Sequence, residues 1–220
     1  MQTGTPIAQF ALLREIEVKS EDEREITLRE VSGAREAEPG LHDLSMQARE
    51  SWPGSWSLTS IRVTPVFPAP WGEAPDSEEE YWRRVDAMVA RARSAGLLDA
   101  ERLRQPPVGW LALVERAVTG LGALMTQEAD RPVAIRVVQL KEKFGTLRLN
   151  IDAVGTRNAR ASAFQIASWA ELCSENRCML TGRPGTLRRG SWLLTLSDEA
   201  AMLRRADPAA FSLRLYPNRR

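Results

Sequence analysis

Histidine is almost absent from this sequence, since His42 is the single one in 220 residues. A single histidine argues against a histidine-dependent catalytic triad and against a metal site built from several histidines. We expect His42 to lie in an exposed polar loop. The sequence also lacks a G-x-x-x-x-G-K-[ST] phosphate loop, a G-x-G-x-x-G turn after a strand and a G-x-S-x-G nucleophile elbow. Carboxylate pairs need no local motif, so an enzyme with an unidentified carboxylate site stays open as an alternative.

Cysteine and long apolar runs are scarce as well. The two cysteines are Cys173 and Cys178, and no apolar stretch approaches the 18 residues typical of a membrane span. The N-terminus has neither the positive region nor the apolar region of a signal peptide. We therefore expect a cytoplasmic protein without a membrane span, without a cofactor, and with both cysteines as thiols.

The formal net charge of +1 conceals two oppositely charged ends. Residues 1–50 carry eleven acidic and six basic side chains, a net of −5, whereas residues 183–220 carry eight basic and three acidic ones, a net of +5. A balanced total argues against a protein built as a whole for nucleic acid. The basic end can still present a face to a partner.

Two parts are predicted along the chain. Residues 1–76 form an N-terminal portion of short strands, among them Leu58 to Val66, which Pro65, Pro68 and Pro70 confine to an edge or end. Its last third is rich in proline and tryptophan. Residues 77–220 form an α+β body that contains an antiparallel sheet with a β-hairpin packed against helices.

Sequence patterns predict most elements of the body. Ser77 and Glu80 make a capping box for a helix that stops near Gly96, and the acidic residues at 76–80 are interpreted as a helix cap rather than a catalytic pair. A second helix is expected over 108–127 and a third after Thr156. Between them, residues 133–151 predict a β-hairpin whose first strand changes phase near Val138, which indicates a bulge.

The stretch "CMLTGRPGTLRRGSWLLTLSDEA" has the spacing of a zinc site but few of its ligands. Positions 178, 181, 197 and 200 follow the pattern C-x2-C-x15-C-x2-(C or H), a strong metal signature when it is filled. Here these positions hold Cys178, Thr181, Ser197 and Ala200. Neutral hydroxyls are poor zinc ligands where thiolate or imidazole is usual, so the sequence predicts no metal.

The motif "VVQLKEKFGTLRL", a short helix and then the stretch above resemble a family of small, largely uncharacterised bacterial and phage-borne proteins. The family pattern pairs a KEKFGxLR hairpin with a C-x2-C…TLC-x2-H zinc-ribbon-like knuckle. The resemblance covers about residues 108–203 and implies that Cys178 stands at the first ligand position of this knuckle. It implies no reaction.

We therefore predict a metal-free, degenerate zinc-ribbon-like knuckle over residues 177–203, in which packing has replaced the metal. Gly182, Pro184, Gly185 and Gly190 would set its turns. The residues expected to have structural roles in this knuckle are Cys178, Thr181, Trp192 and Ser197. Apolar surface is expected to be buried by Leu187, Trp192, Leu194 and Leu196.

We expect a binding surface to form if the hairpin and the knuckle lie side by side in the folded protein. Its candidate residues are basic: Lys141, Lys143, Arg148, Arg183, Arg188 and Arg189. We expect a non-enzymatic protein-binding module, of an immunity type or an accessory protein of a mobile element, whose partner has an acidic surface. The alternative is a nucleic-acid-binding accessory protein that uses the arginine-rich C-terminal region.

Overall fold

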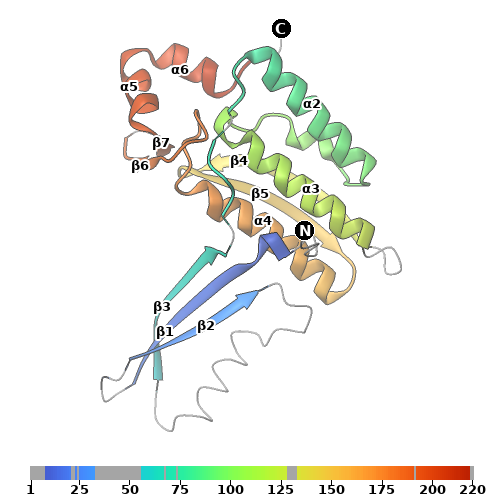
Figure 1. Cartoon of the computed structure of the whole chain (residues 1–220), viewed down its shortest axis with the longest axis vertical. Coiled ribbons are helices and arrows are strands. Elements are labelled where there is room, and N and C mark those ends of the chain that lie inside the picture. Colours follow the sequence, from blue (N-terminus) through green and yellow to red (C-terminus); the bar gives the residue numbers. More distant parts are fainter. Residues whose placement is uncertain are drawn as a thin grey trace. The chain divides into compact units, whose positions relative to one another are not determined.

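The computed structural model describes residues 8–20, 23, 25–32, 56–66, 68–72, 74–127, 133–190 and 192–218. The chain divides into two units, Met1–Phe67 and Pro68–Arg220 (Figure 1). The sequence placed the division after residue 76, whereas residues 68–76 here belong to the second unit. His42 lies outside the described residues. The helices and antiparallel sheets confirm the expected α+β class.

Unit 1 contains a three-stranded antiparallel sheet with the strand order β2-β1-β3. The strands are β1 (Leu12–Ser20), β2 (Glu25–Ser32) and β3 (Trp56–Pro65), preceded by a 3-10 turn at Ala8–Phe10. Ile16 is buried in the central strand and pairs with Leu28 on one side and Ile61 on the other. The strand that ends at Pro65 is an edge strand, as expected, because proline has no N–H for an inner position.

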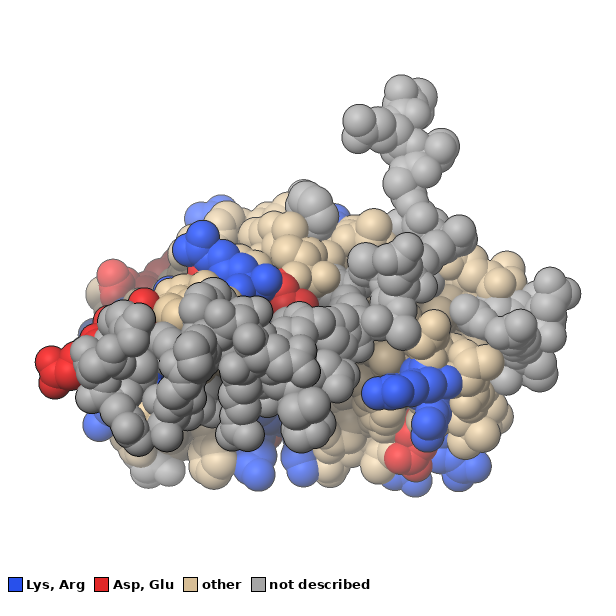
Figure 2. Space-filling model, turned by 90° about the horizontal axis from the view of Figure 1, so that it is seen from below, with Lys and Arg blue, Asp and Glu red and all other residues tan. Residues whose placement is uncertain are grey.

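Charges on the unit 1 sheet are paired across its strands. Arg14 pairs with Glu30 at 3.7 Å and Arg29 with Glu15 at 2.9 Å, and both pairs are cross-strand neighbours. Among the residues drawn in colour in Figure 2, basic and acidic side chains accordingly lie beside one another. The Arg29–Glu15 pair is partly exposed and contributes little to stability, and both pairs keep the described part of the sheet from presenting one sign of charge.

Unit 2 begins its regular structure with α2 (Glu78–Ser94), as predicted. The Ser77 hydroxyl accepts a hydrogen bond from the Glu80 backbone N–H, and the Glu80 carboxylate accepts one from the Asp76 N–H. The helix ends just before Gly96, whose φ of +86° suits glycine. Tyr81 is buried, whereas its neighbour Trp82 is half-buried.

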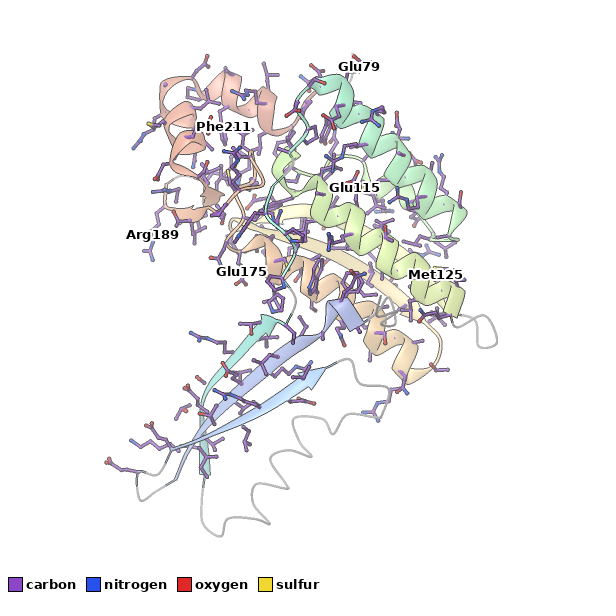
Figure 3. All side chains as sticks on the ribbon, in the orientation of Figure 1. Glu79, Glu115, Met125, Glu175, Arg189 and Phe211 are labelled. Atoms are coloured by element: carbon purple, nitrogen blue, oxygen red, sulfur yellow. The ribbon has the colours of Figure 1, made fainter. Side chains whose placement is uncertain are left out.

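The next helix, α3 (Leu111–Gln127), starts directly after a 3-10 turn at Val108–Trp110 and reproduces the predicted range. It packs against α2 and α4 (Figure 1). A Cβ at Gly122 would lie 3.0 Å from the Ala95 Cβ, so this glycine allows close packing of α3 on the end of α2. Arg84 joins the same two helices through a bidentate contact with Glu115, which Figure 3 labels.

By length and composition alone, Val108–Gln127 is also apolar enough to cross a membrane. The core helix of a soluble protein passes the same test, and 61% of the apolar window is buried inside this structure. The composition of the helix is thus accounted for by its packing and carries no argument about a membrane.

The predicted hairpin consists of β4 (Ala134–Lys143) and β5 (Thr146–Val154). The register shifts between Val137 and Gln139, so the bulge lies at Val138, where the phase change predicted it. Phe144 and Gly145 form the turn with φ values of +55° and +79°. Two residues with positive φ match the right-handed twist of the two strands.

Both edges of this two-stranded sheet are covered by other parts of unit 2. At β4, the Val137 N–H donates to the Leu98 carbonyl at 3.0 Å. At β5, the Leu147 N–H donates to the Ser174 hydroxyl at 2.8 Å and the Leu149 N–H to the Glu171 carboxylate at 3.2 Å. Ser174 and Glu171 belong to α4 (Arg157–Ser174), which starts at the predicted Thr156 cap and packs along β5. These backbone N–H groups would have no protein acceptor at an uncovered sheet edge, and here each has one.

The chain ends in a small hairpin and two helices. The strands β6 (Thr186–Arg188) and β7 (Leu194–Leu196) pair antiparallel, and α5 (Asp198–Ala206) and α6 (Pro208–Leu215) follow. Phe211 of α6, labelled in Figure 3, is buried.

Candidate functional site

The four zinc-ligand positions have structural roles in this protein. Cys178 is fully buried, and its Sγ accepts a hydrogen bond from the Thr181 backbone N–H at 3.4 Å. The Ser197 hydroxyl caps α5 by accepting from the Ala200 N–H at 3.3 Å, and the Ala200 side chain is buried. One thiol beside a threonine, a serine and an alanine does not fit a zinc ion. Within the part of the chain that the structure describes, no group of three or more His, Cys, Asp or Glu could hold a metal.

Backbone contacts with the start of α3 hold the turn at 178–182. The Gly109 N–H donates to the Met179 carbonyl at 2.7 Å, and the Trp110 indole N–H donates to the Arg177 carbonyl at 2.9 Å. A Cβ at Gly109 would lie 2.3 Å from the Cys178 carbonyl oxygen, so the turn rests directly on this glycine. The turn is therefore fixed without a metal.

The expected burial of two apolar knuckle residues was wrong. Leu194 and Leu196 are buried, but Trp192 is 41% exposed and Leu187 is 50% exposed. Trp192 lies in the loop between β6 and β7, and its indole N–H donates to the Glu142 carboxylate at 2.8 Å. Trp192 lies outside the two short strands of this hairpin, whereas Leu187 is the middle residue of β6 and its Cδ1 lies against the turn at Gly145.

The β4–β5 turn and the β6–β7 hairpin are neighbours, as the candidate binding surface required. The Thr195 hydroxyl donates to the Gly145 carbonyl at 2.8 Å, and a Cβ at Gly145 would lie 2.4 Å from Leu187 Cδ1. Next to this contact, Phe144 is 64% exposed, and the Lys143 amine lies 5.3 Å from the centre of its ring. We call the resulting surface the tip surface; its residues are Lys143, Phe144, Leu187, Arg188 and Trp192.

The predicted basic residues are divided between this surface and other places. Lys141 and Arg148 are cross-strand neighbours on the hairpin, and Arg148 pairs with Glu171 at 3.1 Å. Arg188 forms an ion pair with Asp198.

The other two arginines are exposed. Arg189 follows Arg188 at the β6–β7 loop (Figure 3). Arg183 lies in the knuckle turn, where its backbone N–H donates to the Thr181 hydroxyl at 3.3 Å.

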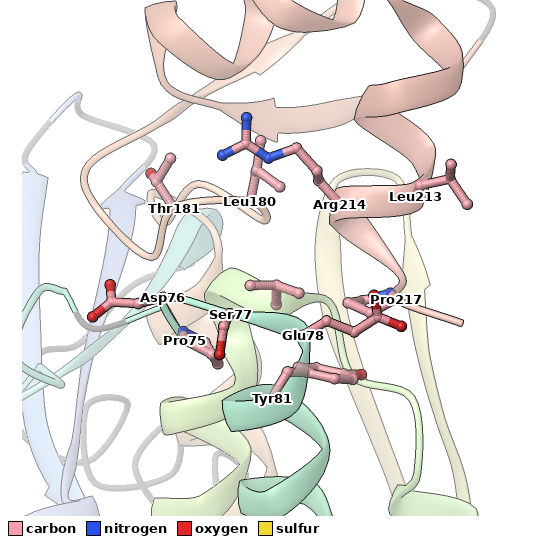
Figure 4. A pocket seen from close by; sticks show the side chains of 11 residues that line it. Pro75, Asp76, Ser77, Glu78, Tyr81, Leu180, Thr181, Leu213, Arg214 and Pro217 are labelled. Carbon is pink, nitrogen blue, oxygen red and sulfur yellow. The ribbon is translucent and has the colours of Figure 1, made fainter. Parts of the chain in front are cut away.

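A cavity of about 270 Å³ lies among the start of α2, the knuckle turn and α6. Figure 4 shows the Arg214 guanidinium on the same side as Leu180 and Thr181, with Asp76 and Glu78 across from it. Tyr81 also lines the cavity, but its hydroxyl donates to the Pro106 carbonyl at 2.8 Å. Burial raises the pKa of Tyr81, so it stays protonated and is a poor general base.

The most buried charged side chain of the described residues is one that no sequence pattern marks. Arg177 is 1% exposed. Arginine is almost never fully buried without a partner, and a single arginine has no periodicity that would mark it as buried.

Comparisons with models of protein families, with curated proteins and with solved structures give no match for this chain. The resemblance to the bacterial and phage-borne family therefore stays an expectation from the motifs alone. Any functional conclusion rests on the geometry described above.

Proposed function

We propose that the protein is a non-enzymatic module that binds another protein through the tip surface. The observation that supports this proposal is the gathering of three exposed apolar side chains, Phe144, Leu187 and Trp192, where two hairpins meet. Large apolar side chains that share one exposed place are typical of interaction sites. Aromatic and arginine side chains also supply most of the binding energy in protein interfaces.

The charges around the tip surface favour a protein over a nucleic acid. Arg188 is paired with Asp198, and the Glu142 carboxylate bonds to Trp192, so negative charge lies inside the surface. Phosphate groups would be repelled by these carboxylates, whereas a protein can match both signs. The proposed partner presents an apolar pocket with an acidic rim that faces Lys143 and Arg189. The cytoplasmic setting and an immunity-type or mobile-element role are part of the same proposal and rest on the sequence alone.

The proposal is tested by site-specific photo-crosslinking in the native cells. A photoreactive phenylalanine at position 144 should give a discrete crosslinked protein band. The same residue at Val154, which is 71% exposed at the far end of the hairpin, is the matched control and should give none. Lys143→Glu should weaken the crosslink at position 144. Equal crosslinking from both positions, or none from position 144, would refute the proposal.

The nucleic-acid alternative predicts a different result in a salt series. Binding to DNA and RNA would be sub-micromolar near physiological salt and would fall steeply as salt rises. The triple variant Arg183→Ala, Arg188→Ala, Arg189→Ala would then lose both the affinity for nucleic acid and its dependence on salt concentration. The protein-binding proposal expects weak association that changes little in this variant.

A further inference from the structure

The side chain of Arg177 is a buried positive charge that contacts only neutral groups among the described residues. Its two terminal nitrogens donate to the carbonyls of Gly182 at 3.2 Å, of Ala69 at 3.0 Å and of Pro70. Its Nε is also buried and has no hydrogen-bond partner in the described structure. Removing a charge from water costs much free energy unless an opposite charge replaces the lost hydration.

A cavity of about 160 Å³ adjoins this guanidinium. A second arginine, Arg116 of α3, lines it together with Trp71, Gly72 and Ala112. The Trp71 ring centre lies 5.3 Å from the Arg177 guanidinium carbon. None of the described residues that line the cavity is acidic. The cavity thus combines two positive charges and an aromatic wall.

We infer that this cavity binds a small oxyanion, a phosphate or a carboxylate, between Arg116 and Arg177. Such an anion would neutralise the buried charge of Arg177. The terminal nitrogens of Arg177 are already used, so Arg116 supplies the bidentate contact. The cavity volume suits an inorganic oxyanion or a short carboxylic acid rather than a nucleotide.

The nearest thiol does not take the place of the anion. Cys173 is close enough to Arg177 for their charges to interact, but burial raises the pKa of the Cys173 thiol and keeps it neutral. Burial and the positive charge of Arg116 lower the pKa of Arg177. Arginine is ordinarily protonated far above neutral pH, so the guanidinium stays charged although its pKa is lowered. The site therefore holds two like charges that a bound anion would relieve.

Isothermal titration with inorganic phosphate and, separately, with acetate tests the inference on the full chain. One of the two should bind saturably with one site per chain and raise the melting temperature. Arg116 is exposed, so Arg116→Gln should fold normally and bind at least about tenfold more weakly, because a charge-assisted bidentate contact is lost. Arg160→Gln, on the exposed face of α4, is the matched control and should bind as the wild type does.

Two outcomes would overturn the inference. The first is the absence of saturable binding of either anion, or equal affinities in wild type and Arg116→Gln. The second concerns Glu73, which is next to Gly72 in the sequence and lies outside the described residues. If only the Glu73→Gln variant binds the anion, a carboxylate of the chain itself neutralises the site. Phosphate binding without acetate binding would assign the site to tetrahedral anions, and the reverse to carboxylates.

Discussion

Replacing Gly109 by alanine is the sharpest test of how the turn at 178–182 is held. The new Cβ would lie 2.3 Å from the Cys178 carbonyl oxygen, 2.5 Å from the Gly182 nitrogen and 2.8 Å from the Met179 carbonyl carbon. Ordinary contacts begin at 3.4 Å, so the turn must move by about 1 Å. All three atoms are backbone, and no side-chain rotation can relieve the clash.

The expected cost follows from what this movement breaks. Overpacking costs about 1–3 kcal/mol, and a buried hydrogen bond left unmade costs about 1–3 kcal/mol more. The bond at risk joins the Gly109 N–H to the Met179 carbonyl. We therefore expect Gly109→Ala to lower the free energy of unfolding by about 3–4 kcal/mol, which corresponds to roughly 6–15 °C in melting temperature.

Urea unfolding followed by circular dichroism and tryptophan fluorescence measures this change. Gly190→Ala is the matched control in the same knuckle, because the nearest atom to its Cβ is Arg204 Nη2 at 3.9 Å. That control should stay within about 0.5 kcal/mol of the wild type. If Gly109→Ala unfolds within 1 kcal/mol of Gly190→Ala, the turn does not depend on its contact with α3.

The remaining predictions use the same measurements. Trp192→Ala should cost less than about 1.5 kcal/mol because the indole is 41% exposed, whereas Leu196→Ala should cost about 2–5 kcal/mol because its side chain is fully buried; the reverse order would contradict the described packing. A chelator should leave the melting temperature unchanged, and elemental analysis that finds one zinc per chain would show that Cys178 has ligands elsewhere. Burial raises the pKa of both Tyr81 and Tyr216, so the stability they contribute is full below pH 10 and is lost at higher pH; Tyr81→Phe should make this alkaline loss less steep, and an unchanged slope in a pH series of urea titrations would contradict it.

Local patterns predicted the elements of unit 2 well because local interactions specify them. Ser77 and Thr156 cap the helices they were expected to cap, and the phase change at Val138 marks a real bulge. These signals need only a few neighbouring residues. Helix ends and strand alternation were therefore visible before any tertiary contact was known.

Burial in the knuckle was less predictable because its strands are too short to show a period. Trp192 was expected inside on hydrophobicity alone, yet the indole lies at the surface beside Glu142. No local pattern marks Arg177 as buried, yet contacts with residues more than 100 positions away bury it. Contacts of that range leave no trace in a local window of sequence.

Those long-range contacts have a consequence for synthesis on the ribosome. Arg177 binds the Ala69 carbonyl across 108 positions, and the Trp82 indole donates to the Asn218 carbonyl across 136. Residues near the start of unit 2 are thus joined by hydrogen bonds to residues much later in the chain. Closing such long loops is slow, because the chain loses conformational entropy on closure before the stabilising contacts form. We therefore expect the last contacts of unit 2 to form only after Asn218 has left the exit tunnel, and α3 to lack part of its apolar cover until then.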